Sequence, residues 1–367
     1  MTGRSVTYLL SISWQIQNIA VAAVVVLMVC LLTFMLMYML GQSVQERKKH
    51  KWRMISDMLI NKAIFYEERD EIEDQILESV LEAAKKLTGN KHFRKFITGE
   101  LISAKKNISG SSSDSLKQFY LQLGLEQYAL RNLDSRQWYV KAQAIQELTV
   151  MDAEEFIDQL QAFTDDKNEY VRMEAQAAMV QFRGFEGLDF LDAITYPLSN
   201  WQQIKLLQLL SARPPSNISM DRWFRSQNSS VVIFALKLAR NYHRFELHDA
   251  IASCLDHDDA DVRLEAIRCL NEIYTDETSD HLIAHFLRES LRNQVAMAKV
   301  MQTVGTKRDE LFLFDLLTYD NDELKLHAAR ALVNASKDGL ISLEKFSKRS
   351  EEPIARILMH IKAEKAA

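Results

Sequence analysis

The sequence predicts an all-α protein in which a single N-terminal transmembrane helix precedes a helical stalk and an α-solenoid of about eight helix pairs. Glycine (10) and proline (4) are scarce in 367 residues, whereas sandwiches, barrels and doubly wound sheets need many tight turns. A long charge-free apolar stretch lies near the N-terminus, and a pattern recurs about every 31 residues through the rest of the chain.

The overall charge argues against a nucleic-acid partner. The formal net charge is −5, so no general positive field draws the chain to nucleic acid. The cysteines Cys30, Cys254 and Cys269 form no metal-binding pattern. Their sparse, odd number fits a reducing compartment.

Residues 19–40 read IAVAAVVVLMVCLLTFMLMYML and contain no charged side chain. As a helix they span about 33 Å, which is enough to cross a hydrocarbon core of about 30 Å. We therefore expect a transmembrane helix over 16–41, preceded by a short extracytoplasmic segment at 1–15. A cleaved signal peptide is the alternative, but only Arg4 precedes the apolar core and no small-residue cleavage site follows it.

Basic residues directly after this stretch predict its orientation. The positive-inside rule places them, and the C-terminal part of the chain, in the cytoplasm. The chain is thus expected to cross a membrane once, with the lipid bilayer as a partner and the basic cluster near anionic headgroups; the resemblance described below implies that this is the bacterial inner (cytoplasmic) membrane. Trp52 is a candidate marker of the headgroup level. The basic cluster comprises Arg47, Lys48, Lys49, Lys51 and Arg53.

Between the membrane and the solenoid we expect a basic juxtamembrane segment and stalk over 42–106. Residues 72–87, IEDQILESVLEAAKKL, have the periodicity of an amphipathic helix. The stalk either caps the open end of the solenoid or binds the partner. The polar sequence NISGSSSDS at 107–115 is the expected linker to a solenoid over 116–367.

The repeat is clearest in VKAQAIQEL, VRMEAQAAM, VRLEAIRCL and LKLHAARAL, which begin at residues 140, 171, 262 and 324. The same register predicts further units at 202, 231, 293 and 355, with one slip of about two residues. Each unit reads as two helices, for example 153–163 followed by a polar turn and the VRxxAxxA helix. Polar residues at the turns suit helix N-caps, namely Asp134, Asp165, Asn228, Asp258 and Asp320.

The turn followed by VRxxAxxAL resembles the HEAT repeat, in the short bacterial form also found in phycobilin lyases. The resemblance covers about 116–367 and implies that basic residues form a ladder between neighbouring repeats, or else face a partner. The pattern departs at Gln203, Val232 and Gln294, where the basic residue is missing. The implied ladder comprises Lys141, Arg172, Arg263, Lys325 and Arg356.

No catalytic pattern appears, and glycine is too scarce for a phosphate-binding loop. His281 and His285 lie one helical turn apart but lack the glutamate of a zinc protease. The acidic run at 256–259 reads as a helix cap rather than a calcium loop. The loop ARPPSN at 212–217 reads as an inter-repeat turn, with docking as the alternative. Nearby aromatics are candidates for a partner patch, although most such residues belong to a core: Trp201, Trp223 and Phe224.

These observations predict a membrane-anchored scaffold rather than an enzyme. The expected partner is a protein, in particular an integral membrane protein, because a solenoid exposes a long surface and a tether raises its local concentration. The resemblance to anchored bacterial HEAT proteins suggests an accessory subunit of an envelope complex, such as a polysaccharide-synthesis machine. The alternatives are a bilin-lyase-like enzyme and a nucleic-acid-binding solenoid. No cofactor, metal or small-molecule ligand is expected.

Overall fold

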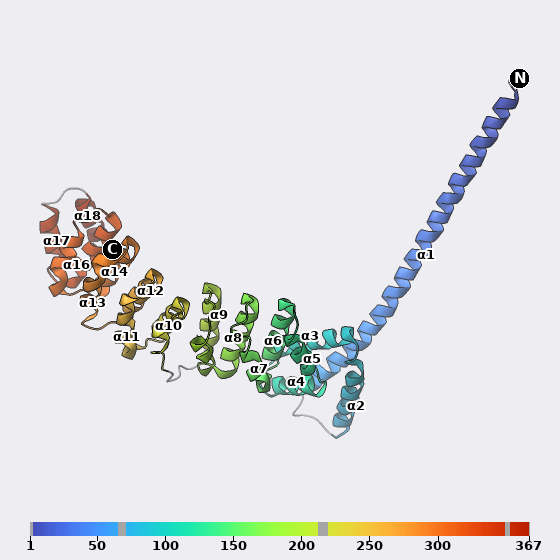
Figure 1. Ribbon diagram of the computed structural model, residues 1–367, viewed down its shortest axis with the longest axis horizontal. Coiled ribbons are helices and arrows are strands. Elements are labelled where there is room, and N and C mark those ends of the chain that lie inside the picture. The colour runs from blue at the N-terminus through green and yellow to red at the C-terminus, as the bar shows by residue number, and fades with distance from the viewer. Residues whose placement is uncertain (1–2, 65–70, 212–218, 349–352, 367) are drawn as a thin grey trace. The chain divides into compact units, whose positions relative to one another are not determined.

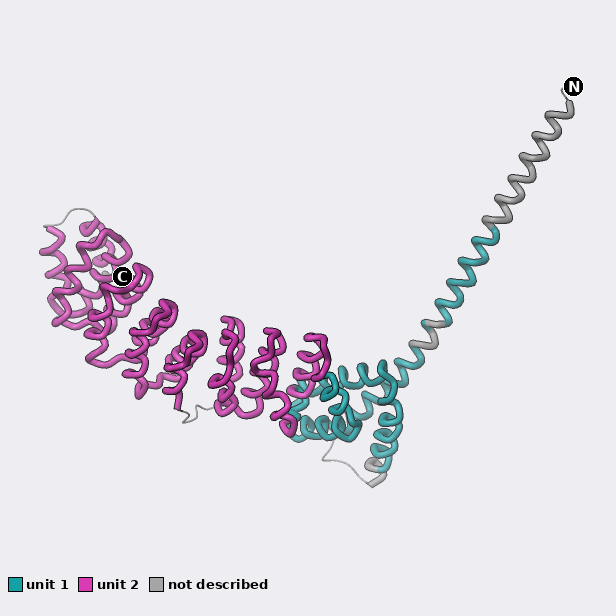
Figure 2. The backbone as a smooth tube through the Cα atoms, in the orientation of Figure 1, with its two compact units in different colours: residues 1–132, 150–153 teal, residues 133–149, 154–367 magenta. Residues whose placement is uncertain are grey.

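The computed structural model describes residues 3–64, 71–211, 219–348 and 353–366 (Figure 1). Side chains are described for these residues except 3–24, 41, 43–45, 71–74 and 366. Within these ranges the chain is helical and contains no strand, as the sequence predicts. It divides into two compact units (Figure 2): unit 1 comprises residues 1–132 and 150–153, and unit 2 comprises residues 133–149 and 154–367.

Unit 1 is a helical cluster around the C-terminal end of its first helix. That helix packs against three of the others and buries Leu59 and Ala63 completely. Phe93, Ile97 and Leu101 share one helical face and are also fully buried, because their spacing of four residues brings them to the same side. The helices are α1 (Gly3–Ile64), α2 (Glu71–Leu87), α3 (Lys91–Asn107), α4 (Ser111–Gln122) and α5 (Glu126–Leu133).

The polar segment at 107–115 is mostly helical. Helix α3 ends at Asn107 and α4 begins at Ser111, so residues 108–110 alone separate the two helices. Asp114 lies in the first turn of α4, where an acidic side chain is favourable to the helix dipole. Ser115 and Leu116 are buried, which fixes this serine-rich stretch in unit 1.

The predicted transmembrane stretch lies in α1. Its described residues, Val25–Leu40, are exposed throughout, with the large apolar side chains between 53% and 75% accessible. In the part of the chain that the structure describes, no helix combines the length and apolarity needed to cross a membrane. The side chains of residues 16–24 and 41, within the predicted span, and of 1–15 lie outside the described ones. The transmembrane helix therefore stays a prediction.

Unit 2 consists of successive helical repeats. Its long helices follow one another side by side (Figure 1), with contacts between α8 and α9, α10 and α12, α12 and α14, and α14 and α16. They are α6 (Trp138–Val150), α8 (Glu169–Arg183), α9 (Asn200–Ser211), α10 (Ser229–Asn241), α12 (Ala260–Leu270), α14 (Leu291–Val304), α16 (Asp322–Ala335) and α18 (Ile354–Ala366).

The predicted repeat register is confirmed. The long helices begin at 138, 169, 200, 229, 260, 291, 322 and 354, in steps of 31, 31, 29, 31, 31, 31 and 32 residues. The two-residue slip at 231 appears as the short step to α10. Each motif starts about two residues inside its helix, and its apolar positions are buried, as for Val262, Ala266 and Leu270. Stacking of neighbours buries these faces, which no single repeat could bury alone.

The first segment of most repeats is shorter than the helix that we expected. Residues 153–163 contain only η2 (Glu154–Phe156) and α7 (Ile157–Gln161), and 3₁₀ turns alone precede α9 and α10. Apolar periodicity does not separate a short α-helix from a 3₁₀ turn. The remaining segments are η3 (Glu186–Asp192), η4 (Trp223–Arg225), η5 (Phe245–Leu247), α11 (His248–Ser253), η6 (Cys254–Asp256), α13 (Thr278–His285), η7 (Phe286–Arg288), η8 (Lys307–Asp309), α15 (Glu310–Leu316) and α17 (Gly339–Ser347).

The helix N-caps lie later in the turns than predicted, except at Asn228. The side chain of Asn168 accepts from the N–H groups of Tyr170 and Val171, and thereby caps α8. Asp259 caps α12 and Asn321 caps α16, each one residue after the predicted cap, Asp258 or Asp320. The capping side chain must reach an N–H two or three residues ahead. Because each turn contains several polar residues, the sequence alone does not show which of them is the cap.

Candidate functional site

The candidate functional site is a surface of unit 2 formed by the first turns of its long helices. Tyr139, Tyr170 and Trp201 are each the second residue of a helix, in α6, α8 and α9. They are therefore spaced by 31 residues and occupy the same position in three successive repeats. Their exposed fractions are 53%, 56% and 65%. Together with Trp138, which is 46% exposed, we call these residues the aromatic row.

Two rings of the aromatic row contact each other between repeats. Trp138 and Tyr170 are stacked, with ring centroids 5.0 Å apart and an interplanar angle of 23°. Trp138 also meets Tyr139 edge-on at 5.9 Å. Beside the row, the guanidinium of Arg172 lies 4.4 Å from the ring centroid of Tyr196. These contacts hold large apolar rings in fixed positions while leaving about half of each ring exposed to solvent.

The same helix position turns polar in the later repeats. The second residues of α10, α12, α14 and α16 are Ser230, Asp261, Arg292 and Glu323. Asp261 and Arg292 form an ion pair of 2.8 Å between neighbouring repeats. The position thus changes from aromatic to small and then to charged along unit 2.

Where the position becomes small, the surface is hollowed. A hollow of about 820 Å³ is lined by Ser230 and Asp261 together with turn residues that precede α9 and α10, including Pro197 and Ser226. This volume falls within the range of about 300–1,000 Å³ typical of binding sites. The small side chain of Ser230 leaves the space that an aromatic ring would take in the preceding repeats.

The hollow combines apolar and charged side chains, and its carboxylates outnumber its basic groups. Its lining includes the carboxylates of Asp192, Asp259 and Asp261 and the guanidinium of Arg222. The N–H of Asp261 donates to Asp259, and this bond holds the pKa of the Asp259 carboxyl below its usual range despite partial burial. Asp192 accepts from the indole N–H of Trp223 at 2.8 Å.

The first two predicted ladder residues make structural contacts. Lys141 forms an ion pair of 3.5 Å with Asp166 of the next repeat. Arg172 is buried and donates to the backbone carbonyls of Asp166 and Lys167 at 2.8 and 3.2 Å. Arg172 therefore stabilises the turn before its own helix and also contacts the ring of Tyr196 in the following repeat.

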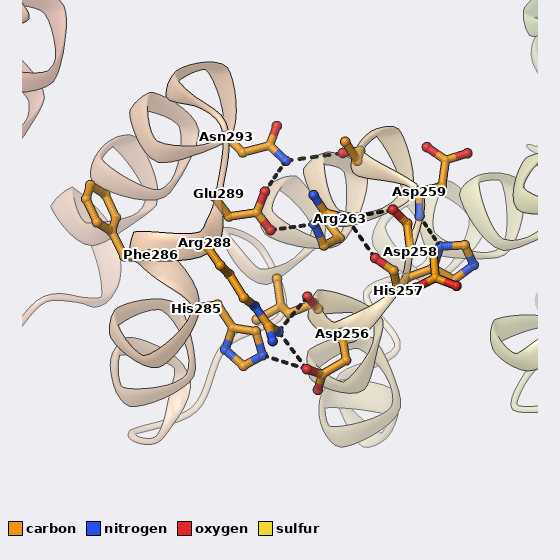
Figure 3. A network of polar contacts seen from close by, with 12 residues as sticks. Asp256, His257, Asp258, Asp259, Arg263, His285, Phe286, Arg288, Glu289 and Asn293 are labelled. Carbon is orange, nitrogen blue, oxygen red and sulfur yellow. Dashed lines mark hydrogen bonds and ion pairs between the residues drawn. The ribbon is translucent and has the colours of Figure 1, made fainter.

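Arg263 makes the corresponding contacts in a later repeat (Figure 3). It donates to the carbonyls of His257 and Asp258 at 2.8 and 2.9 Å, and its Nε lies 2.5 Å from the carboxylate of Glu289. Glu289 also accepts from Asn293 at 2.8 Å. These residues join two repeats through one buried polar network. Of the other two ladder residues, Lys325 is half-buried on α16 and Arg356 is exposed on α18.

The repeats without the basic residue differ in how their turns are held. Gln203 donates to the carbonyl of Leu198 at 3.2 Å and accepts from Lys237 at 2.8 Å. Gln294 donates to the carbonyl of Phe286 at 3.0 Å. A glutamine thus takes over part of the role of the arginine, whereas Val232 is apolar and fully buried.

The other polar candidates belong to the joints between repeats. Asp256 accepts from Arg288 at 2.6 Å and lies 3.2 Å from Nε2 of His285 (Figure 3). His281 instead faces the ring of His248, with centroids 6.1 Å apart, so the two histidines do not converge on one point. Among the described residues, no group of three or more His, Cys, Asp or Glu side chains is placed to hold a metal ion.

The predicted aromatic patch is corrected by the structure. Trp223 and Phe224 are 1% and 6% exposed, because their segment packs against α10, whereas Trp201 is exposed. The loop at 212–217 lies outside the described residues. In unit 1, the five basic residues that follow the predicted span are all exposed. Trp52 packs edge-on against Phe93 at 5.7 Å and is therefore part of the packing of unit 1.

The aromatic row itself was not predicted from the sequence, although Trp201 was singled out. Its signal is nevertheless present: the spacing of 139, 170 and 201 equals the repeat length. The repeat is recognised from apolar positions that face inward, whereas the aromatic row occupies an outward position of the same repeat.

No known protein family and no curated protein matches the chain. An engineered protein resembles it at 17% identity over 76% of this chain and 86% of the other, with a TM-score of 0.37. Human deoxyhypusine hydroxylase resembles it at 15% identity over 79% and 98%, with a TM-score of 0.30. A designed armadillo repeat protein does so at 16% identity over 57% and 99%, with a TM-score of 0.30. The helical repeat architecture rests on the helix spacing and contacts of unit 2.

Proposed function

We propose that this protein is a membrane-anchored scaffold whose repeat unit binds a protein partner through the aromatic row. The observation that carries the proposal is the exposure of Tyr139, Tyr170 and Trp201 at one position of three successive repeats. Aromatic residues are enriched where protein interfaces are strongest. Exposed singly they would be unremarkable, but their recurrence at one position of successive repeats, with Trp138 stacked on Tyr170, gathers apolar rings along one surface.

The partner segment would combine apolar side chains with a basic residue. The apolar part would lie along the row, and the basic group would enter the hollow beside Asp259, because Asp192 and Asp261 already form ion pairs with Arg222 and Arg292. On this proposal the protein acts by binding and not by catalysis, with no cofactor.

Membrane anchoring is the second part of the proposal. It is supported by the charge-free sequence at 19–40 and by the exposure of every described residue from Val25 to Leu40. Exposing that much apolar surface to water would cost about 25 cal/mol for each Å², which a bilayer removes. The basic residues from Arg47 to Arg53 support an orientation with the N-terminus outside and the repeats in the cytoplasm.

An integral membrane protein is the partner that this arrangement favours. The anchor holds the scaffold in the same bilayer and raises its effective concentration there. The resemblance to anchored bacterial HEAT proteins extends the proposal to an accessory subunit of an envelope complex, such as a polysaccharide-synthesis machine.

Affinity purification of the full-length protein from its native membrane tests the proposal. The wild type is compared with the double variant Tyr170→Ala, Trp201→Ala. The matched control is Leu287→Ala, Leu311→Ala, because those leucines are 82% and 80% exposed but lie outside the row. We expect a membrane protein that is retained by the wild type and by the control and is lost from the row variant. Equal retention by all three would refute the role of the row.

A further inference from the structure

Unit 1 contains a second feature, a cavity between α1 and α3. Its volume is about 540 Å³, again within the range of about 300–1,000 Å³ for ligand sites. Trp52 of α1 and Phe96 of α3 form one wall, with ring centroids 6.0 Å apart and tilted by 42°. Both rings are half-buried, so the wall is apolar, rigid and accessible from the cavity.

Basic side chains from both helices surround this wall. Lys48 and Lys49 of α1 line the cavity, and Lys95 and His92 of α3 line it from the other side. The three lysines are exposed. Of the described residues that line the cavity, Glu100 alone bears a carboxylate. The balance of formal charge is therefore positive even with His92 neutral.

The N-terminus of α3 adds to this potential. Asn90, which lines the cavity, caps the helix by accepting from the N–H groups of His92 and Phe93. Helix α3 has 17 residues, and the start of such a helix carries about half a positive charge. Ammonium groups, an aromatic wall and a helix start together suit a phosphate that is attached to a small organic group.

We propose that this cavity binds the phosphodiester headgroup of an anionic phospholipid. The phosphate would lie between the lysines, and the headgroup alcohol, on the side of the phosphate away from the bilayer, would lie against Trp52 and Phe96. This step rests on the proposed membrane anchoring. Lys48 lies eight residues after Leu40, or about 12 Å along the helix, and a headgroup layer is about 5–8 Å thick. The long lysine stems bridge the remaining distance.

The cavity divides the basic cluster into two sets. Lys48 and Lys49 line it, whereas Arg47, Lys51 and Arg53 do not. A diffuse electrostatic attraction to the membrane would use both sets about equally, since each basic residue near an anionic surface contributes similarly. A headgroup site uses only the first set, together with Lys95.

Native mass spectrometry of the delipidated full-length protein in a non-ionic detergent tests this proposal. Phosphatidylglycerol, phosphatidylcholine and inorganic phosphate are titrated separately, and the bound adducts give the dissociation constants. We expect phosphatidylglycerol to bind at least about tenfold more tightly than either of the other probes. The variant Lys48→Gln, Lys49→Gln, Lys95→Gln should weaken that binding by about tenfold or more.

The matched control is Arg47→Gln, Lys51→Gln, Arg53→Gln, which removes the same formal charge, all of it from the basic cluster of α1. We expect it to change the affinity by less than about twofold. Equal weakening by both variants would overturn the site in favour of diffuse attraction. Equal binding of both lipids would also overturn it, and tighter binding of inorganic phosphate would assign the cavity to a soluble ligand and overturn the lipid headgroup.

Alkaline carbonate extraction of native membranes separates this result from the anchoring proposal. If the protein stays in the membrane but binds lipids without preference, the headgroup site alone is refuted. If carbonate releases the protein, the anchor is refuted, and the headgroup proposal falls with it whatever the affinity in detergent.

Discussion

Trp138 of one repeat stacks on Tyr170 of the next, with their ring centroids 5.0 Å apart. The stack is made at the exposed edge of unit 2 and not in its core. Such an aromatic pair contributes about 0.5–1.5 kcal/mol beyond its buried area. Because both residues stay about half exposed, about half of their surface is available to a partner.

We expect the aromatic row to contribute little to folding. Substituting Trp201, which is 65% exposed, with alanine should lower the free energy of unfolding by no more than about 0.5 kcal/mol, as for a surface site. Chemical unfolding followed by circular dichroism measures this change. In contrast, Trp223→Ala, at a site that is 1% exposed, should cost about 3–5 kcal/mol. A large loss of unfolding free energy in Trp201→Ala would show that the row serves folding rather than binding.

Asp165 should stabilise unit 2 in a pH-dependent way. Burial disfavours its charge, but bonds from Thr195 and Tyr196 and the charge of Arg172 outweigh burial and lower the pKa of its carboxyl from 3.8. A lowered pKa gives stability that is present above the ordinary value and is lost as the pH falls through the folded one. We therefore expect Asp165→Asn to destabilise at pH 7 by about 1 kcal/mol or more.

The difference between wild type and Asp165→Asn should shrink as the pH falls below about 4. Urea unfolding of both proteins at a series of pH values measures it. A difference that stays constant down to pH 3 would show that the ionised carboxylate is not the source of the stability.

Gly187 should not tolerate a larger side chain. A Cβ atom there would lie 2.1 Å from the backbone oxygen of Met179, so η3 would have to move away from α8. We expect Gly187→Ala to destabilise by about 1–3 kcal/mol. The control is Gly99→Ala, because no atom lies within 4 Å of the Cβ position there and alanine favours a helix by about 0.5–1 kcal/mol. In thermal unfolding we expect Gly187→Ala to lower the midpoint temperature and Gly99→Ala to raise it.

The three cysteines provide a test of the anchor. Burial raises the pKa of the Cys254 and Cys269 thiols to about 12, so neither should react with a maleimide in the folded protein. Cys30 is exposed in the structure and lies in the predicted span. In native membranes we expect no labelling by a water-soluble maleimide, followed by labelling of Cys30 after detergent is added. Labelling of Cys30 in intact membranes would contradict the anchor.

The repeats of unit 2 could be predicted because their register depends on inward apolar positions such as Val171 and Val262, which stacking forces to recur. The turns were harder to predict. Asp165 was expected to cap a helix, but its carboxylate accepts from Thr195 in the next repeat. Such contacts depend on how neighbouring repeats are placed, which spacing alone does not contain.

The repeat geometry also reaches into unit 1, where the period did not predict it. Arg94 donates to the carbonyl of Thr88 at 2.8 Å, six residues earlier, as Arg172 does to Asp166. In both helices an asparagine four residues before the arginine is the N-cap. Phe93 precedes Arg94 as Val140 precedes Lys141 in the first repeat. The two positions are 47 residues apart, which is no multiple of 31, so the regular spacing does not continue into unit 1.

The cavity and the hollow could not be predicted from the sequence. The hollow depends on the small size of Ser230 at a position that bears rings in earlier repeats. The cavity depends on the packing of α1 against α3, which brings Lys95 to the same place as Lys48. Both arise where side chains distant in sequence meet.

Site-specific photo-crosslinking in native membranes tests the central claim most directly. A photoreactive amino acid replaces Trp201 in the full-length protein, and in a second variant it replaces Leu311, which is 80% exposed but lies outside the aromatic row. We predict an adduct between position 201 and an integral membrane protein, and none from position 311. Equal adducts from both positions, or none from position 201, would contradict the account of a membrane-anchored scaffold that binds through the aromatic row.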